Sequence, residues 1–164
     1  MFKLIYFMVK NLPSSKLINN IRTYLYKPYF KAIGKNNIIG RSVNIANIHN
    51  IILCDNITIN AEVYLVASKS KIVIGNNVLI APRCVLQTQN HNYIEKNILI
   101  REQGDISSDI IIQDDVWLGL NVMILPGVII AQGCVIGAGS VVTKSTEPYG
   151  VYIGIPAKKI KERK

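Results

Sequence analysis

The stretch DDVWLGLNVMILPGVIIAQGCVIGAGSVVTK, residues 114–144, carries an aliphatic residue at every sixth position. Counted from two residues before the stretch, these positions are Ile112, Leu118, Ile124, Ile130, Ile136 and Val142. Four residues after each of them stands a small or branched residue: Val116, Val122, Val128, Cys134, Ser140 and Thr146. A helix needs apolar residues every three or four positions, so a step of six excludes an amphipathic helix and favours short strands.

The same step extends through the earlier half of the chain and slips by one residue before it resumes. Its members there are Ile33, Ile39, Ile45, Ile51, Ile57 and Val63, then Ile74, Ile80 and Leu86. The intervening strings GKNN, GRS, GNN, QDD, LPG, AQG and GAG supply residues that tolerate tight turns and positive φ. One hexad cannot bury its aliphatic side alone. About fifteen hexads are therefore predicted to wind into an all-β solenoid of about five triangular coils, three hexads to a coil.

The length of 164 residues, with 49% hydrophobic and 18% charged residues, fits a single folded domain. The repeat divides the chain into a basic amphipathic N-terminal segment at 1–32, a solenoid at 33–147 and a basic tail at 148–164. One long interruption, residues 92–109, breaks the repeat. Loops of this length in a compact fold are more often functional than structural, so we expect this one to protrude beside a functional site.

The net charge of +9 is concentrated at the two ends of the chain, and eight Lys or Arg residues precede the first acid, Asp55. Neither basic end carries a recognisable nucleic-acid reader, so no nucleic-acid partner is expected. We expect residues 1–30 to form a basic helix that caps the solenoid. Its aromatic residues also suit a weak contact with an anionic membrane surface.

The three cysteines, Cys54, Cys84 and Cys134, are an odd number without CxxC spacing, which favours a reducing compartment. A cytoplasmic protein is therefore expected, and the basic N-terminal segment leaves a position at the inner face of the membrane open. The chain has two histidines, too few for a zinc site with three histidine ligands, and no metal is expected.

Residues 114–144, followed by PYGVYIGIPAKKIK at 148–161, resemble the hexapeptide-repeat acyltransferases, in particular the branch that O-acetylates sugars and surface polysaccharides. The resemblance covers residues 33–160. It implies a left-handed parallel β-helix, acetyl-CoA as the acyl donor, and a homotrimer whose sites are shared between neighbouring subunits.

His91 is the strongest catalytic candidate because it opens the long loop, where the resemblance also places the family's general base. Acetyl transfer to an alcohol requires a group that removes the hydroxyl proton, and imidazole, with an ordinary pKa of about 6.5, can do so at neutral pH. Glu102 is the preferred carboxylate to orient the imidazole, with Asp105 and Glu95 as the other candidates. His49 is interpreted as structural.

The predicted coenzyme site combines backbone groups with cations. The N–H groups where Gly119 meets Leu120 are candidates for the oxyanion hole. The resemblance implies that the coenzyme contacts Ala138, Thr143, Lys144, Lys158 and Lys161. Trp117, the single tryptophan, is predicted either to wall the acceptor site or to pack on the outside of the solenoid.

The predicted activity is acetyl-CoA-dependent O-acetylation of a sugar hydroxyl in a surface polysaccharide or its precursor, by direct transfer. N-acetylation of an amino sugar nucleotide or an antibiotic is the alternative, and a non-catalytic β-helix scaffold is the third. Galactoside-type relatives bind the acceptor through an Asn and an Asp where this chain has Ala61 and Lys69. Small galactosides are therefore not the expected acceptors.

Overall fold

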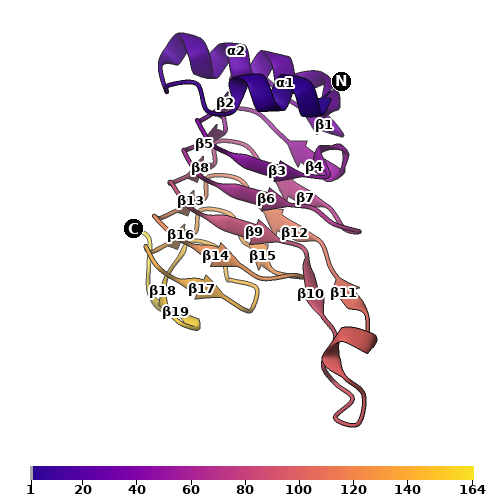
Figure 1. Ribbon diagram of the computed structural model, residues 1–164. Helices are drawn as coiled ribbons and strands as arrows, with labels where there is room; N and C mark the ends of the chain where they lie inside the picture. The colour runs from indigo at the N-terminus through magenta and orange to yellow at the C-terminus, as the bar shows by residue number, and fades with distance from the viewer. Residues whose placement is uncertain (1) are drawn as a thin grey trace.

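The computed structural model, which describes residues 2–164, is a three-sided parallel β-solenoid preceded by two helices (Figure 1). Sheet A contains β1 (Ala32–Ile33), β4 (Ile51–Leu53), β7 (Ile72–Ile74), β12 (Ile110–Ile112) and β15 (Ile129–Ile130). Sheet B contains β2 (Ile38–Ile39), β5 (Thr58–Ile59), β8 (Leu79–Ile80), β13 (Trp117–Leu118), β16 (Val135–Ile136), β18 (Gly150–Gly154) and β19 (Ala157–Glu162). Sheet C contains β3 (Asn44–Ala46), β6 (Tyr64–Val66), β9 (Val85–Gln87), β14 (Met123–Ile124) and β17 (Val141–Val142). The chain visits A, B and C in turn, which confirms the predicted coils of three strands.

Aliphatic side chains stack inside the prism as predicted, but the register of the second coil differs from the prediction. From Ile74 onward, the residues that recur every six positions are also the ones that stack in neighbouring strands. Ile112, for example, pairs with Ile74 on one side and with Ile130 on the other. In the second coil the corresponding positions are Leu53, Ile59 and Leu65, whereas the predicted residues Ile51, Ile57 and Val63 lie two positions earlier and are also fully buried. A short 3-10 helix, η2 (Ile48–Asn50), adds two residues before this coil.

The turns between the sheets adopt the left-handed backbone conformation that their composition predicts. Each of the seven turn strings contains a residue with positive φ, namely Asn36, Ser42, Asn77, Asp115, Gly127, Gly133 and Gly139. Along the edge between sheets A and B, the side chains of Asn36, Asn56 and Asn77 form a series of hydrogen bonds of 3.1 Å. These amides connect successive coils where the strand hydrogen bonds end.

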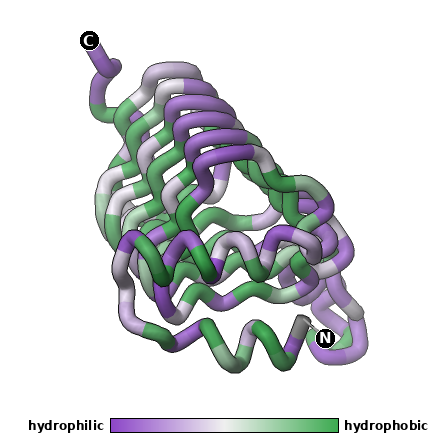
Figure 2. Tube along the Cα trace, turned by 90° about the horizontal axis from the view of Figure 1, so that it is seen from above, coloured by the Kyte–Doolittle hydropathy of each residue, from purple (hydrophilic) through white to green (hydrophobic). Residues whose placement is uncertain are grey.

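The N-terminal segment forms two helices, α1 (Phe2–Val9) and α2 (Lys16–Tyr26), followed by the 3-10 turn η1 (Lys27–Tyr29), rather than one helix. Pro13 disfavours helical backbone in the residue before it, and the Ser15 hydroxyl accepts the N–H of Ile18 at the start of α2. Seen along the prism axis, the helices lie across one end of the solenoid (Figure 2).

Side chains of these helices form hydrogen bonds with the first coil, whose outer side has no further strand to pair with. The Thr23 hydroxyl accepts the N–H of Ile39 at 3.0 Å, and Arg22 donates to the carbonyl of the same residue at 3.0 Å. The Tyr6 hydroxyl donates to the carbonyl of Val43 at 2.9 Å. Arg22 also donates to the carbonyls of Val9 and Leu12, and its burial lowers the pKa of its guanidinium.

Replacing the fully buried Arg22 by methionine is expected to destabilise the protein by about 2 kcal/mol, because three backbone carbonyls each lose a hydrogen bond from the guanidinium. This corresponds to a fall of about 4 to 8 °C in the thermal midpoint. Circular dichroism melting would measure it, with Lys16→Met, an exposed change on the same helix, as the control. A midpoint for Arg22→Met equal to that of the control would contradict the role assigned to the guanidinium.

The predicted loop and tail both contain strands. At the base of the loop, β10 (Gln89–His91) and β11 (Asp105–Ser107) form a protruding antiparallel hairpin, and the 3-10 turn η3 (Ile100–Glu102) lies beyond it (Figure 1). In the tail, β18 and β19 pair antiparallel and extend sheet B. No helix within residues 2–164 is long and apolar enough to cross a bilayer.

Candidate active site

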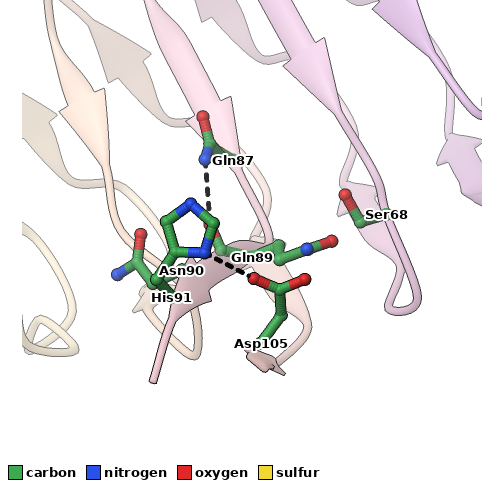
Figure 3. Close-up of a pocket in the computed structure, with 6 residues that line it drawn as sticks. All are labelled: Ser68, Gln87, Gln89, Asn90, His91 and Asp105. Atoms are coloured by element: carbon green, nitrogen blue, oxygen red, sulfur yellow. Dashed lines mark hydrogen bonds and ion pairs between the residues drawn. The ribbon is translucent and has the colours of Figure 1, made fainter. Parts of the chain in front are cut away.

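His91 and Asp105 form the central pair of the candidate site. They lie directly opposite each other in the β10–β11 hairpin, and His91 Nδ1 is 2.8 Å from Asp105 Oδ1 (Figure 3). Opposite residues of an antiparallel pair project side by side, so the register of the hairpin brings the two groups together. The imidazole is 77% exposed and therefore accessible to a ligand.

The contact with Asp105 fixes which nitrogen of His91 is available for proton transfer. With Nδ1–H donating to the carboxylate, the lone pair of the neutral ring is on Nε2. Among the described residues, 2–164, no group forms a hydrogen bond with Nε2. The arrangement can accept a proton from a bound hydroxyl, and the carboxylate can stabilise the resulting imidazolium.

The structure brings Asp105, and not the predicted Glu102, into contact with the imidazole of His91. Glu102 lies exposed in η3, away from the strand pairing that brings Asp105 to His91. Glu95 is also exposed, and its backbone N–H bonds to the side chain of Gln103. The position of the carboxylate depends on the register of the hairpin, and the sequence pattern did not reveal that hairpin.

An open pocket of about 230 Å³ adjoins the His91–Asp105 pair (Figure 3). Its other lining residues are polar: Ser68, Gln87, Gln89 and Asn90. The Gln87 amide donates to the carbonyl of Gln89 at 2.9 Å. Gln87, Gln89 and His91 alternate in sequence, which is the signal that could have placed them on one side of an extended segment. A polar lining of this kind suits a hydroxylated ligand.

The predicted oxyanion donors differ in availability. The N–H of Gly119 bonds to the carbonyl of Ile136 at 2.8 Å and belongs to the coil ladder. The N–H of Leu120 makes no hydrogen bond among residues 2–164, so it is the available donor of the pair. A Cβ at position 119 would lie 2.7 Å from the backbone nitrogen of Ala138, so the close approach of these coils requires glycine.

The predicted site residues lie on two different edges of the prism. Leu120 and Ala138 stand at the turns from sheet B to sheet C, in successive coils. The hairpin that carries His91 leaves from the turn between sheets C and A, the edge on which Thr143 and Lys144 follow β17. A single chain therefore does not bring His91 and the Leu120 donor to one edge.

Trp117 lies on the outer side of sheet B, paired in register with Leu79 and Val135. It is about half exposed and does not line the pocket beside His91. Of the two predicted placements, the structure of the single chain has the tryptophan on the outside of the solenoid.

The lysines of the β18–β19 hairpin, together with Lys144, fall into two groups, those with and those without a carboxylate partner. Lys159 lies 2.7 Å from Glu147 and 2.8 Å from Glu162, and these hydrogen bonds raise its pKa. Lys158 and Lys161 are exposed on the same strand, and Lys144 is exposed after β17. Within the described chain these three form no ion pair, so their charges remain available to an anionic ligand.

The three cysteines are free thiols that are buried or partly buried in the solenoid. Burial raises the pKa of the Cys84 thiol to about 11, and this thiol donates to the carbonyl of Gly119 at 3.0 Å. Cys134 is also buried, and Cys54 is partly buried with a raised pKa from desolvation. Over residues 2–164 no group of three or more His, Cys, Asp and Glu side chains could hold a metal ion.

Comparison with known proteins places these features in a family. Residues 109–144 match the family described as bacterial transferase hexapeptide (six repeats). Galactoside O-acetyltransferase of Escherichia coli K12 is 36% identical over 142 residues, which are 86% of this chain and 68% of that protein. A putative colanic acid biosynthesis acetyltransferase of the same organism is 31% identical over 92% of this chain and 79% of its own.

The fold agrees with solved structures of such proteins. A galactoside acetyltransferase in complex with coenzyme A superposes with a TM-score of 0.85 at 32% identity, over 98% of this chain and 78% of that one. With the hexapeptide match, this confirms the predicted left-handed β-helix. Some relatives are longer: the match covers only 43% of a putative acetyltransferase of Schizosaccharomyces pombe.

Proposed function

The chain belongs to the hexapeptide-repeat acetyltransferase family, and on this premise we propose that it transfers an acetyl group from acetyl-CoA to a sugar hydroxyl of a surface polysaccharide or its precursor. The galactoside and colanic acid relatives support a sugar acceptor, and the relative solved with coenzyme A supports the donor. The observation that carries the proposal is the His91–Asp105 pair beside a polar pocket.

In the proposed reaction, Nε2 of His91 removes the proton of the sugar hydroxyl as its oxygen attacks the thioester carbonyl. Asp105 stabilises the imidazolium that forms. The N–H of Leu120 donates to the oxyanion of the tetrahedral intermediate. When the carbon–sulfur bond breaks, the thiolate of coenzyme A takes the proton from the imidazolium, which regenerates the neutral histidine.

A homotrimer would supply the groups that one chain separates. His91 and Leu120 belong to different edges of the prism, so we propose that the His91 edge of one copy meets the Leu120 and Ala138 edge of its neighbour. Half-exposed outward residues on sheet B, such as Leu79 and Trp117, would be covered in such a closed assembly. Use of acetyl-CoA supports a cytoplasmic location.

Lys144→Ala and Lys158→Ala are each expected to weaken acetyl-CoA binding about tenfold, through loss of a charged contact with the coenzyme phosphates. The loss should be smaller for the donor that lacks the 3′-phosphate. Isothermal titration with both donors measures the difference, and Lys35→Ala, an exposed lysine near the opposite end of the solenoid, is the control. Equal losses for the two donors would remove the phosphate assignment.

An acceptor screen tests the activity itself. Purified protein, acetyl-CoA and a panel of oligosaccharides, amino sugar nucleotides and antibiotics are assayed for release of free thiol. Alkaline hydroxylamine cleaves acetyl esters and leaves acetyl amides, so treatment of the purified product distinguishes O- from N-acetylation. Ester formation on a polysaccharide fragment is the expected result, whereas amide products alone would contradict the proposal.

A further inference from the structure

The helices at the end of the solenoid have an apolar surface that the cap does not use. In α1 the partly buried residues Ile5, Tyr6 and Val9 pack against the core. On its outer side Leu4, Phe7 and Met8 are 66%, 82% and 65% exposed. A helix that covers a core needs one apolar side. Because α1 has apolar residues on both sides, a second apolar medium is indicated as the partner of its outer side.

The second helix repeats this arrangement. Arg22, Thr23 and Tyr26 are buried toward the first coil, while Leu17, Ile21 and Tyr24 are exposed at spacings of four and three residues. Such spacing places the three on one side of the helix. A pocket of about 240 Å³, lined by residues of both helices and of η1, opens beside Tyr24 and Lys27.

The charge around this surface is of one sign. Residues 1–54 hold eight Lys or Arg and no Asp or Glu, whereas residues 55–164 hold 11 basic and 10 acidic residues. Lys3, Lys16 and Lys27 are exposed, and no ion pair involves them within the part of the chain that the structure describes. The net positive charge of the protein is therefore concentrated in residues 1–54, the segment that contains the apolar helix surface.

We infer that the outer side of α1 and α2 docks on an anionic lipid bilayer, with Leu4, Phe7 and Met8 entering the boundary between headgroups and acyl chains. Exposed lysines beside them contact the lipid phosphates, and each adds about fivefold to the partition coefficient. Apolar side chains combined with lysines are the composition of interfacial helices. A second copy of the chain suits this surface less well, because it would bring two uncompensated basic segments together.

Docking through this surface leaves the catalytic pocket accessible. The helices lie at one end of the solenoid, and the hairpin that carries His91 extends away from them (Figure 1). None of the residues that line the pocket beside His91 belongs to the helices. The prism would stand on the membrane with its helical end down, and the acetylation site would face outward from the lipid.

Cosedimentation of the full chain with vesicles tests the inference. Vesicles of phosphatidylcholine and phosphatidylglycerol in equal amounts are expected to bind the protein at low salt, and pure phosphatidylcholine vesicles are not. Replacing Lys3, Lys16 and Lys27 together by glutamine should weaken binding about a hundredfold, from three contributions of about fivefold each. Replacing Leu4, Phe7 and Met8 together by serine should weaken it at least about tenfold.

Matched controls place the same substitutions elsewhere on the surface. Lys69, Lys71 and Lys96 changed to glutamine, and Tyr93, Ile94 and Leu99 changed to serine, alter exposed residues outside the helices and should leave vesicle binding unchanged. The inference is overturned if neither vesicle type binds, if both bind equally, or if the controls weaken binding as much as the helix variants. A serine variant whose mass by light scattering falls below that of the wild type would instead assign the surface to contacts between copies.

Discussion

The His91→Ala variant is expected to lose a factor of about 10² to 10⁴ in transfer rate, the usual contribution of a general base. The imidazole has its Nδ1 on Asp105 and its Nε2 toward solvent at the pocket, and no other histidine lines that pocket. Steady-state thiol release with the acceptor found in the screen measures the loss. Binding of acetyl-CoA and the thermal midpoint should remain those of the wild type, because the side chain is exposed and on a hairpin outside the coils.

His49→Ala is the matched control for this variant. His49 is exposed in η2, at the turn between the first two coils, and it lines none of the described pockets. Its removal should leave the rate unchanged. A His91→Ala enzyme that keeps more than roughly a tenth of the wild-type rate would exclude His91 as the base.

Asp105→Asn is expected to lower kcat about a hundredfold, with little change in the KM for acetyl-CoA. The neutral amide can still contact the imidazole, but it no longer stabilises the imidazolium and it permits the wrong tautomer. In the proposed reaction Asp105 is a positioning residue, because its assigned action on the substrate runs through its contact with His91. Asp105→Glu retains the charge and should recover part of kcat, which a purely structural role of the aspartate would not predict.

Glu102→Gln provides the comparison that separates the two candidate carboxylates. Both residues belong to the same protruding segment, but only Asp105 lies opposite His91 in the hairpin. Glu102→Gln should therefore have wild-type kcat. If it lost more activity than Asp105→Asn, the structural assignment of the carboxylate would be wrong and the sequence preference for Glu102 would stand.

The periodicity of six predicted the three-sided solenoid because every coil repeats one physical requirement, an inward aliphatic residue followed by a turn. It misassigned Ile51, Ile57 and Val63, since a hexad has two inward positions and both accept aliphatic residues. The insertion at η2 moves the strand position by two residues, and the step of six continues through the other inward position of the hexad. Periodicity alone cannot distinguish the two inward positions of a hexad, whereas the pairing of the strands can.

For the site, the sequence indicated His91 because a break in the repeat marks its position. It offered Asp105 only as an alternative to Glu102, since the pairing of His91 with Asp105 depends on where the chain turns within the loop. Nor did the sequence pattern show that Leu120 and His91 lie on different edges, because hexads that follow one another in the sequence occupy three sides in space. Contacts set by the register of non-local strands are the part that sequence patterns do not determine.

The bonds from Thr23, Arg22 and Tyr6 to the first coil have a consequence for aggregation. A β-solenoid has no intrinsic length, since each coil offers the next one the same ladder of backbone donors and acceptors. An uncapped end would accept the end of another molecule as readily as a further coil of its own, the growth that produces fibrils. By occupying part of that ladder with side chains, the helices act as a stop. They keep the solenoid a particle of defined size rather than one segment of a filament.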